Sequence, residues 1–420
     1  MATQIAGIVL LAVMFIIATA LPINMGALAL VGAFIIGLLS HLSPRDIFAG
    51  FPGDLFVTLV GITYLFAIAQ NNGTVDWLVH KAVWLVRGRI AAIPWVMFTV
   101  AAVLTAVGAV SPAAVAIIAP IALRFSQRYK ISPLLMGLVV IHGAQAGGFS
   151  PISIYGGITN QVVERAGLPR NDLALFLASF FFNLGVAVLI FFLFRGHRTG
   201  RFSEREDRKE LSDGEPESVQ IGLNKHRALT LVGLLSLGVG SLALELNIGL
   251  LAISVAVLLA LLAPHDQKRA IEQVSWPTVL LITGVITYIA VLQKIGAVDL
   301  VGNSVSRIGA PLLAALLLCY IGGIVSAFAS SIAVLGTTIP LAVPFLLQGH
   351  VHAVGVVAAI AVSTTIVDVS PFSTNGALVV ANSQGVDKDH FYRQMLIYSA
   401  VVVAIGPFLT WLVLVLPRWL

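Results

Sequence analysis

The 420-residue chain has very few charged residues. Only 10% of its residues are Asp, Glu, Lys or Arg, whereas 58% are hydrophobic and the mean hydropathy is +0.99. Because soluble domains carry roughly 25% charged residues, this chain cannot cover itself with a solvated surface. Its apolar segments are continuous and long enough for helices, which excludes alternating membrane strands. The sequence therefore predicts an all-α polytopic membrane protein.

Other scarce or missing features exclude further classes of structure and function. The single cysteine, Cys319, excludes an intramolecular disulfide and lies in an apolar run, which predicts a packing role. No HExxH or GxSxG motif occurs, so an intramembrane enzyme is disfavoured. The net charge of +5 reflects the basic loops expected of a membrane protein, and we expect no nucleic-acid partner. Residues 4–19 lack the flanks of a cleaved signal peptide and are expected to stay as a helix.

The chain repeats its polar landmarks about 220 residues apart. In a hydrophobic chain, duplicated halves with matched interruptions are typical of secondary transporters. The matched landmarks are Gly147–Ser153 with Val367–Ser373, Ser111 with Ser331, Pro120 with Pro340, Gln70–Asp76 with Gln293–Asp299, and Pro44 and Asp46 with Pro264 and Asp266.

Eight apolar stretches are each predicted to cross the membrane once. They are residues 4–19, 24–40, 54–71, 172–194, 227–243, 247–263, 276–293 and 391–416. Four more apolar stretches are interrupted by Gly, Ser, Pro or Asp, and these are residues 91–127, 133–166, 310–347 and 354–384. The first and third could each be two full helices with a tight turn, or a re-entrant hairpin that returns to its own side.

The distribution of Lys and Arg favours the re-entrant arrangement. If 91–127 and 310–347 are re-entrant hairpins, and 133–166 and 354–384 cross once as broken helices, each half has five crossings and the two halves are inverted. This topology puts 18 of the 24 Lys and Arg on the cytoplasmic side, as the positive-inside rule requires. Both termini then lie outside an inner or plasma membrane. The predicted organisation is a first inverted repeat over 1–194, a flexible cytoplasmic linker over 195–226 and a second inverted repeat over 227–420.

The four interruptions are where we expect the binding site. Helices broken at membrane depth expose N–H and C=O groups that lipid cannot satisfy, so such breaks survive only inside protein or beside a polar cavity. Half-helix N-termini favour an anion, while freed carbonyls and hydroxyls can hold Na⁺. Small residues can also serve close helix packing alone, but their symmetric placement favours a site. The predicted substrate-binding residues are Ser111, Ser150, Pro151, Ser153, Ser331, Ser370, Pro371, Ser373, Thr374 and Asn375. The predicted Na⁺ ligands are Ser111, Gly148, Ser330, Ser331 and Asp368.

None of the four interruptions carries a Lys or Arg. An anionic substrate must therefore be neutralised by helix dipoles and by cations that bind with it. Moving one charge through the membrane potential is worth about 2.3 kcal/mol per 100 mV. A dianion that enters an inside-negative cell thus needs at least two coupled cations, and a third would let the potential drive uptake. This pattern predicts cation-coupled import.

The stretch GAQAGGFSPISIYGGITN, Gly143 to Asn160, together with a hairpin and a broken helix in each half, resembles the malonate and dicarboxylate carriers called MatC. These carriers are similar to the divalent-anion/sodium symporters, and the resemblance covers the chain apart from the linker. It implies a homodimer in which a transport domain moves like an elevator against a scaffold that includes the helices within 4–71. It also implies Na⁺ sites at each hairpin tip, with the carboxylates of the substrate between them.

The chain departs from the Ser-Asn-Thr signature that the symporters carry at each tip. The first tip reads Ser111-Pro112-Ala113 and the second reads Ser330-Ser331-Ile332. The amide and one hydroxyl are missing from the first tip. This difference leaves the number of Na⁺ sites open and shifts the expected substrate contacts to residues 150–154 and 370–375.

Asp368 breaks the symmetry of the two halves, because it occupies the position that matches Gly148. A carboxylate inside a membrane segment is costly unless it serves an ion or a proton. We therefore expect Asp368 to bind the coupled cation, Na⁺ or H⁺. The alternative is a cation/proton antiporter, or a proton-coupled organic-anion transporter, in which Asp368 carries the exchanged ion.

Other polar residues in apolar segments have less specific interpretations. His142 precedes the first break and is interpreted as a structural histidine with satisfied hydrogen bonds. Asp76 and Asp299 occupy equivalent places and are interpreted as helix caps or hinges. Tyr155 and Asn160 follow the first break and could line its cavity.

Overall fold

The computed structural model describes residues 1–21, 23–75, 77–78, 81, 90–194, 222–242, 244, 246–263, 267–297, 300, 310–328, 331–347, 351–383 and 387–417. These residues contain 18 α-helices and one short 3₁₀-helix, and no strand is found among them. The all-helical class expected from composition is confirmed. Most of the linker, residues 195–221, lies outside the described residues, as do Asp76, Asp299 and Ser330.

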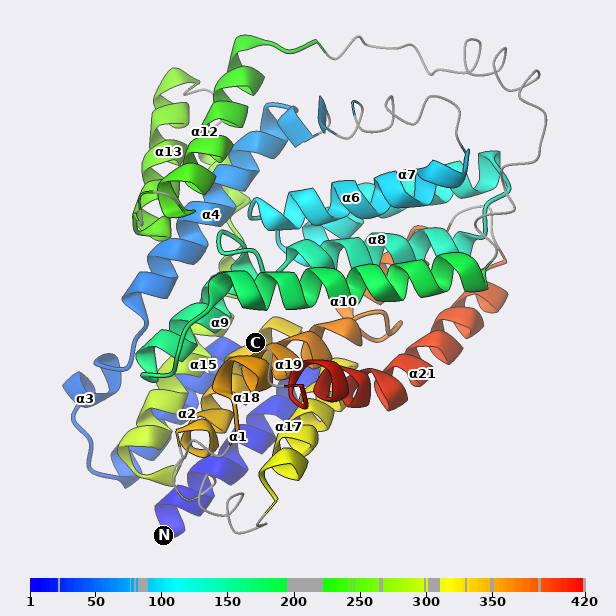
Figure 1. Ribbon diagram of the computed structural model, residues 1–420. Helices are drawn as coiled ribbons and strands as arrows, with labels where there is room; N and C mark the ends of the chain where they lie inside the picture. The colour runs from blue at the N-terminus through cyan, green and yellow to red at the C-terminus, as the bar shows by residue number, and fades with distance from the viewer. Residues whose placement is uncertain are drawn as a thin grey trace, which may run out of the picture.

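The helices of the two halves are shown in Figure 1. The first half contains α1 (Ala2–Ala20), α2 (Met25–Leu39), α3 (Pro44–Phe48), α4 (Gly53–Asn71), η1 (Ile90–Ala92), α6 (Ile93–Ala106), α7 (Ser111–Arg128), α8 (Pro133–Gly147), α9 (Ile154–Arg165) and α10 (Asp172–Leu193). The second half contains α12 (Lys225–Leu242), α13 (Ile248–Leu262), α14 (Gln267–Glu272), α15 (Trp276–Lys294), α17 (Pro311–Ser326), α18 (Ser331–Leu346), α19 (Ala353–Ile366), α20 (Thr374–Ala381) and α21 (Lys388–Leu414).

The helices have the length and surface of membrane helices. Among the described residues, α4, α10, α15 and α21 are long and apolar enough to cross a bilayer, and eight apolar stretches of 10–17 residues accompany them. Large apolar side chains such as Phe181, Leu189 and Leu261 are more than 60% exposed. Such a surface would drive a soluble protein to aggregate, but it suits contact with lipid. The chain is therefore a multi-pass membrane protein.

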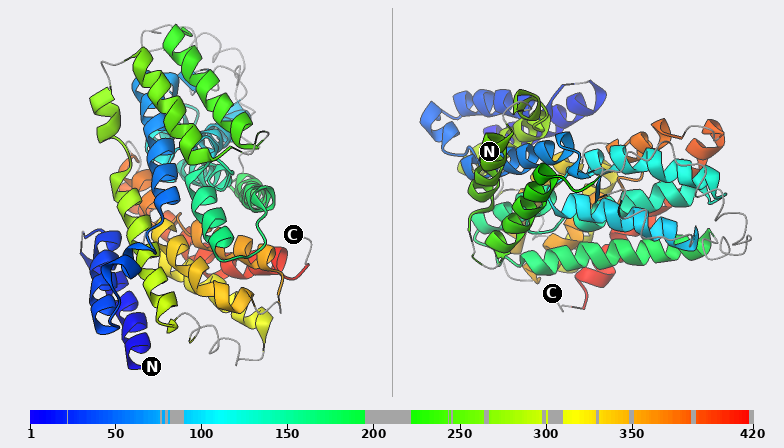
Figure 2. Two further views of the ribbon diagram at one scale, coloured as in Figure 1. Left: turned by 90° about the vertical axis from the view of Figure 1, so that its left-hand side faces the viewer. Right: turned by 90° about the horizontal axis from the view of Figure 1, so that it is seen from above.

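The helices pack in two groups. We name the first group the α4/α15 group. It is formed by the packing of α1 with α2, α2 with α15, α4 with α13, and α12 with α13. Helices α6–α10 and α17–α21 form the second, which we name the hairpin group. In Figure 1, α4, α12 and α13 lie at the left, while α6, α7, α8 and α10 extend to the right. The left view of Figure 2 shows α15 between the α1–α2 pair and helices α17–α19. Helices α4 and α15 contact the hairpin group through α9 and α18.

Glycines allow α2 and α15 to pack with their backbones in direct contact. A Cβ atom at Gly26 would lie 2.0 Å from the carbonyl oxygen of Leu280, and one at Gly284 would lie 2.1 Å from the carbonyl oxygen of Gly26. Both distances are far below van der Waals contact, and the obstructing atoms are backbone. Without a hydrophobic effect between helices in lipid, this close approach is a main source of attraction between them.

We predict that Gly284→Ala lowers the thermal stability of the purified protein by an amount typical of overpacking, about 1–3 kcal/mol. The matched control is Gly238→Ala in α12, where a new Cβ would have no atom within 4 Å. The control should be neutral or stabilising by up to about 1 kcal/mol, since Ala is the better helix former. Equal melting temperatures for the two variants in detergent would contradict the contact.

Candidate functional site

Two helices of the hairpin group are interrupted in their middle. Helix α8 ends at Gly147 and α9 begins at Ile154, which leaves the first break at residues 148–153. Helix α19 ends at Ile366 and α20 begins at Thr374, which leaves the second break at residues 367–373. The breaks coincide with the Gly, Ser, Pro and Asp residues that interrupt the two apolar stretches.

The two breaks have the same local geometry. The N–H groups of Ser150 and Ser153 donate to the carbonyls of Gly147 and Ser150, at 3.1 and 2.9 Å. In the second break, the N–H groups of Ser370 and Ser373 donate to the matching carbonyls of Val367 and Ser370, at 3.0 and 2.9 Å. The hydroxyls of Ser153 and Ser373 each donate to the carbonyl three residues earlier at 2.7 Å.

The helix that restarts after each break is packed against its own loop by a glycine. A Cβ atom at Gly156 would lie 2.1 Å from the Ser150 carbonyl oxygen, and one at Gly376 would lie 2.0 Å from the Ser370 carbonyl oxygen. Only glycine lets the new helix start so close to the unwound segment. Both breaks are therefore compact loops with defined shapes.

The first hairpin tip, residues 106–111 between α6 and α7, contacts both breaks. The Ser150 hydroxyl donates to the carbonyl of Ala106 at 2.5 Å. The side-chain amide of Asn375, just after the second break, donates to the Ser111 hydroxyl at 2.8 Å. Segments that are far apart in the sequence thus meet at one turn of the chain.

The second hairpin tip, residues 326–331 between α17 and α18, also reaches the second break. Phe328 stacks on Phe372 with ring centroids 5.8 Å apart. The Ser331 hydroxyl lies beside the Asp368 carboxyl group and 2.9 Å from the hydroxyl of Ser326. Residues 329 and 330 of this tip lie outside the described residues, so the predicted ligand Ser330 cannot be placed.

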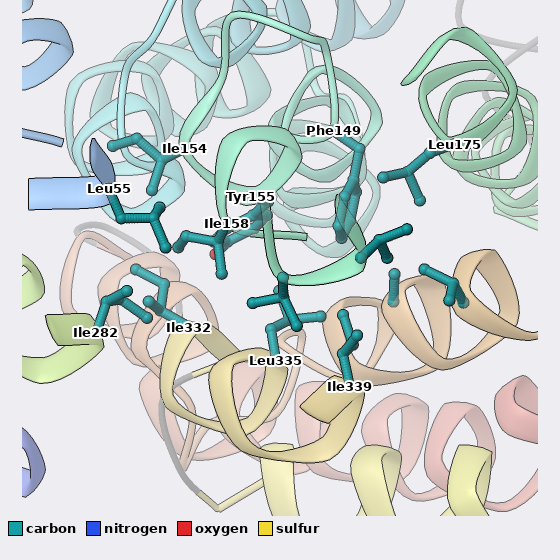
Figure 3. Packing of buried hydrophobic residues seen from close by; sticks show 14 of the residues in the cluster. Leu55, Phe149, Ile154, Tyr155, Ile158, Leu175, Ile282, Ile332, Leu335 and Ile339 are labelled. Carbon is teal, nitrogen blue, oxygen red and sulfur yellow. The ribbon is translucent and has the colours of Figure 1, made fainter. Parts of the chain in front are cut away.

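Helix α18 packs directly against the first break and α9. Figure 3 shows Ile332, Leu335 and Ile339 of α18 facing Phe149, Tyr155 and Ile158 of the first break and α9. All six side chains are buried and belong to one hydrophobic cluster. This apolar layer keeps lipid and bulk water from the polar residues beside it.

Asp368 and Asn375 form the polar centre of the site. Asp368 is 2% exposed, and it is the only Asp, Glu, Lys or Arg that is buried in the part of the chain that the structure describes. Its carboxylate accepts hydrogen bonds from the Asn375 side chain at 2.8 Å and the Asn375 backbone N–H at 3.4 Å. The side-chain oxygen of Asn375 is buried and has no hydrogen-bond partner. A carboxylate and a free amide oxygen are thus held beside the hydroxyls of Ser111 and Ser331.

Each break borders a cavity. One cavity, of about 280 Å³, lies at the second break, where Phe372 and Thr374 meet Phe15 and Asn24 of the α4/α15 group. The other, of about 700 Å³, extends from Pro151 in the first break to charged residues at the ends of α4 and α9. The larger cavity lies within the range of pockets that hold small molecules, roughly 300–1,000 Å³, and the smaller one lies just below it.

The remaining predicted residues are distributed around this centre. Ser150, Ser153, Ser370, Pro371 and Ser373 are buried in the two breaks, whereas Thr374 is exposed. In the first break, Gly148 presents its carbonyl oxygen to the hydroxyl of Ser153. The structure thus brings Ser111, Ser331, Asp368, Ser373 and Asn375 together, and it leaves Thr374 facing the smaller cavity.

Several weaker interpretations can also be compared with the structure. Both ring nitrogens of His142 are hydrogen-bonded, to Asn183 at 3.0 Å and to Tyr398 at 2.8 Å, which confirms the structural interpretation. Asn160 lines the larger cavity, whereas Tyr155 packs on Phe149 in the apolar layer. Cys319 is buried, as its sequence context predicts.

Sequence reasoning missed the residues of the α4/α15 group that face the breaks. Asn24 lines the smaller cavity, and Asp54 lines the larger one and forms an ion pair with Arg165. In the sequence, Asn24 can be identified only as the N-cap of α2, and Asp54 only as an acidic residue in the first turn of α4. No local signal distinguishes them from ordinary helix ends.

The chain is similar to known transporters over part of its length. Residues 1–148 match the family model for the N-terminus of the dicarboxylate carrier protein MatC. Over these residues the chain is similar to dicarboxylate carriers of the MatC type. Two transporters described as uncharacterized, from Mycobacterium bovis and Mycobacterium tuberculosis, are each 25% identical to it over 328 residues, covering 76% of this chain and 75% of theirs.

Solved structures support the same architecture. The Neisseria gonorrhoeae protein MtrF, described as illuminating a class of antimetabolite efflux pumps, matches with a TM-score of 0.59 and 14% identity, covering 90% of this chain and 84% of its own. The YdaH transporter of Alcanivorax borkumensis, described as having an unusual topology, matches with a TM-score of 0.54 and 13% identity, covering 87% and 86%. At these identities the likeness shows the fold alone. The helices therefore adopt a fold that is also found in solved structures of transporters.

We predict that Asn375→Ala destabilises the protein, because it removes the side-chain amide that donates to both Asp368 and Ser111. Leaving a buried polar group without its partner costs about 1–3 kcal/mol, and more for a charged group. The control is Asn382→Ala at the end of α20, whose side chain donates only to the carbonyl of Leu378. Thermal unfolding in detergent should show the larger loss for Asn375→Ala, and a loss no larger than that of the control would contradict this role.

Proposed function

We propose that the protein is a secondary active transporter that imports a small dicarboxylate, such as malonate, coupled to Na⁺. The observation that carries the proposal is the group formed by Asp368, Asn375 and Ser111 at the contact between the first hairpin tip and the second break. Ser331 of the second hairpin tip lies at the same carboxylate. One acid and several neutral oxygens are thus contributed by three separate segments.

The residues of this group fit Na⁺ as the coupled ion. Hard cations prefer oxygen ligands, and in transporters with broken helices the unwound segments coordinate Na⁺ or H⁺. The unpartnered side-chain oxygen of Asn375 is a buried acceptor that a cation would satisfy. Asp368 would supply the negative charge, and Ser111 and Ser331 would supply hydroxyl oxygens. Gly148, at the matching position of the first break, offers only its carbonyl oxygen.

The surroundings of the breaks fit an anion beside this cation. Helices α7, α9, α18 and α20 all begin at the tips or breaks, so their positive ends are available to a carboxylate. Hydroxyls and N–H groups of residues 150–154 and 370–375 would bind it. No Lys or Arg occurs at these segments, so the co-bound cations must supply the positive charge. At about 2.3 kcal/mol per charge per 100 mV, the import of a dianion needs at least two of them.

The arrangement of the helices supports an elevator mechanism with alternating access. The matching hydrogen bonds of the two breaks fit two inverted repeats of five crossings each, with a hairpin and a broken helix in both. In this proposal the hairpin group moves as the transport domain, and the α4/α15 group is the scaffold of a homodimer. The termini lie outside the cell, and the linker over 195–226 lies in the cytoplasm.

Uptake by proteoliposomes tests the function directly. With an inward Na⁺ gradient, purified carrier should accumulate radiolabelled malonate or a related short dicarboxylate, and an inside-negative potential should accelerate uptake if three cations enter with each dianion. Replacing Na⁺ by K⁺ should abolish accumulation. Equal uptake in both salts, or no uptake of any dicarboxylate, would refute Na⁺-coupled import.

The variant Asp368→Asn separates this proposal from a cation/proton antiporter. We predict a loss of Na⁺-dependent uptake of about tenfold or more, since interactions with a charged group contribute about 1.5–3 kcal/mol. Asp389→Asn, in the exposed first turn of α21, is the control and should transport normally. Proton movement driven by Na⁺ without any dicarboxylate, lost in Asp368→Asn, would favour the antiporter instead.

A further inference from the structure

Polar contacts join the hairpin group to helix α4 at the mouth of the larger cavity. Arg165, at the end of α9, forms an ion pair with Asp54 in the first turn of α4. One turn deeper, the side-chain amide of Gln161 donates to the Thr58 hydroxyl at 3.2 Å. The residues are spaced by four on both helices, so the two contacts lie along one line between the two groups of helices.

The cavity beside these contacts leads to the first break. Its lining includes Pro151, next to Ser150 of the break, and continues past Asn160 to Arg165. Leu246 and Asn247, just before α13, also line it. A small molecule in this cavity would therefore lie between the exposed end of α9 and the predicted substrate residues.

The cavity contains a hydrogen-bond donor without an acceptor. The side-chain nitrogen of Asn160 is buried and unpartnered, and the residue is only 5% exposed. Leaving such a group unsatisfied costs about 1–3 kcal/mol. A carboxylate or water in the cavity would remove this cost, and Arg165 lies five residues further along the same helix.

The two arginines of the cavity differ in how firmly they are held. Arg170 makes two hydrogen bonds to Asp172, at 2.5 and 2.6 Å, and one to Glu164 at 2.6 Å. The hydrogen bonds to Asp172, with the nearby charges of Asp172 and Glu164, keep the pKa of Arg170 above its usual value. Arg165 instead pairs with Asp54 through a single nitrogen, and both side chains are more than one-third exposed. Exposed pairs contribute only about 0–1 kcal/mol, so the guanidinium of Arg165 can accept a second carboxylate or exchange its partner.

We propose that this cavity is an outer binding subsite for the dicarboxylate, in which Arg165 exchanges Asp54 for a substrate carboxylate and so breaks the ion pair between α9 and α4. The inference rests on the proposed function and adds a step before the substrate reaches the breaks. Asn160 donates to the arriving anion, and the forked guanidinium binds it in two places. The exchange removes one of the two polar contacts between α9 and α4 and leaves the contact of Gln161 with Thr58 in place.

Recognition in this subsite is local. The acids Asp54, Glu164 and Asp172 outnumber the bases Arg165 and Arg170 by one, so the cavity as a whole does not gather anions by its net charge. The available donors, and not long-range attraction, determine where the anion binds.

Kinetics of malonate uptake in three variants tests the exchange. A purely structural ion pair predicts that Asp54→Asn and Arg165→Gln change KM in the same direction, since each breaks the pair. The exchange predicts opposite directions. Arg165→Gln raises KM about tenfold, the equivalent of 1.4 kcal/mol, whereas Asp54→Asn lowers KM or leaves it unchanged because Arg165 becomes free.

Arg170→Gln is the matched control, because it removes a charge of the same sign from the same cavity. It should change KM less than threefold, since Arg170 is already held by two acids. An equal rise in KM for Arg165→Gln and Arg170→Gln would mean that only the loss of a positive charge from the cavity matters. That result would overturn the proposal. A rise in KM for Asp54→Asn would overturn it as well.

A second measurement does not depend on transport and keeps the two proposals distinguishable. In a Cys319→Ala background, Leu246→Cys places a thiol in the lining of the cavity. This thiol is reacted with two methanethiosulfonates, one carrying a negative sulfonatoethyl group and the other a positive trimethylammonium-ethyl group. The two reaction rates show which charge the cavity admits. Arg165→Gln should lower the ratio of anionic to cationic rates several-fold more than Arg170→Gln, and equal effects would overturn the subsite. If wild-type protein moves no dicarboxylate, the proposed function fails, and this ratio still decides whether Arg165 receives anions.

Discussion

The structure depends on how backbone polar groups are satisfied where two helices break in an apolar environment. Lipid offers no partner for a free N–H or C=O group, so an unwound segment must be enclosed by protein. The first hairpin tip contacts both unwound regions, because the Ser150 hydroxyl donates to the Ala106 carbonyl and the Asn375 side-chain amide, just after the second break, donates to the Ser111 hydroxyl. Helix α18 adds an apolar layer over the first break. The contacts that make the breaks tolerable are therefore the contacts that assemble the site.

The two breaks are nearly symmetric in structure, but one residue makes them chemically different. The two breaks share backbone hydrogen bonds, serines at matched positions and close-packed glycines, but Asp368 stands where the first half has Gly148. The carboxylate is held by Asn375, which is tied in turn to the opposite half of the chain. A cation bound there would join segments from both halves. Ion binding and the closing of the site would thus be one event, which is what coupling between an ion and a substrate requires.

The sequence predicts those parts of the molecule whose signal is local. Gly, Ser and Pro within apolar runs mark the two breaks, and Ser111 marks the start of α7, because such residues are costly in lipid unless they are used. The pairing of Asn375 with Ser111 could not be predicted, since it joins positions 264 residues apart. Asp54 and Arg165 were also not found, because charged residues at helix ends are ordinary. The cavities depend on how side chains from several helices leave space, which no single segment encodes.

The central claim is that Na⁺ at the Asp368 group prepares the site for a dicarboxylate. Thermal unfolding of the purified carrier in Na⁺ or K⁺, with and without malonate, measures this linkage directly, because a ligand that binds the native state stabilises it by RT ln(1 + [L]/Kd). The account predicts that Na⁺ alone raises the melting temperature and that malonate raises it further only when Na⁺ is present. The same stabilisation by malonate in Na⁺ and in K⁺ would contradict it.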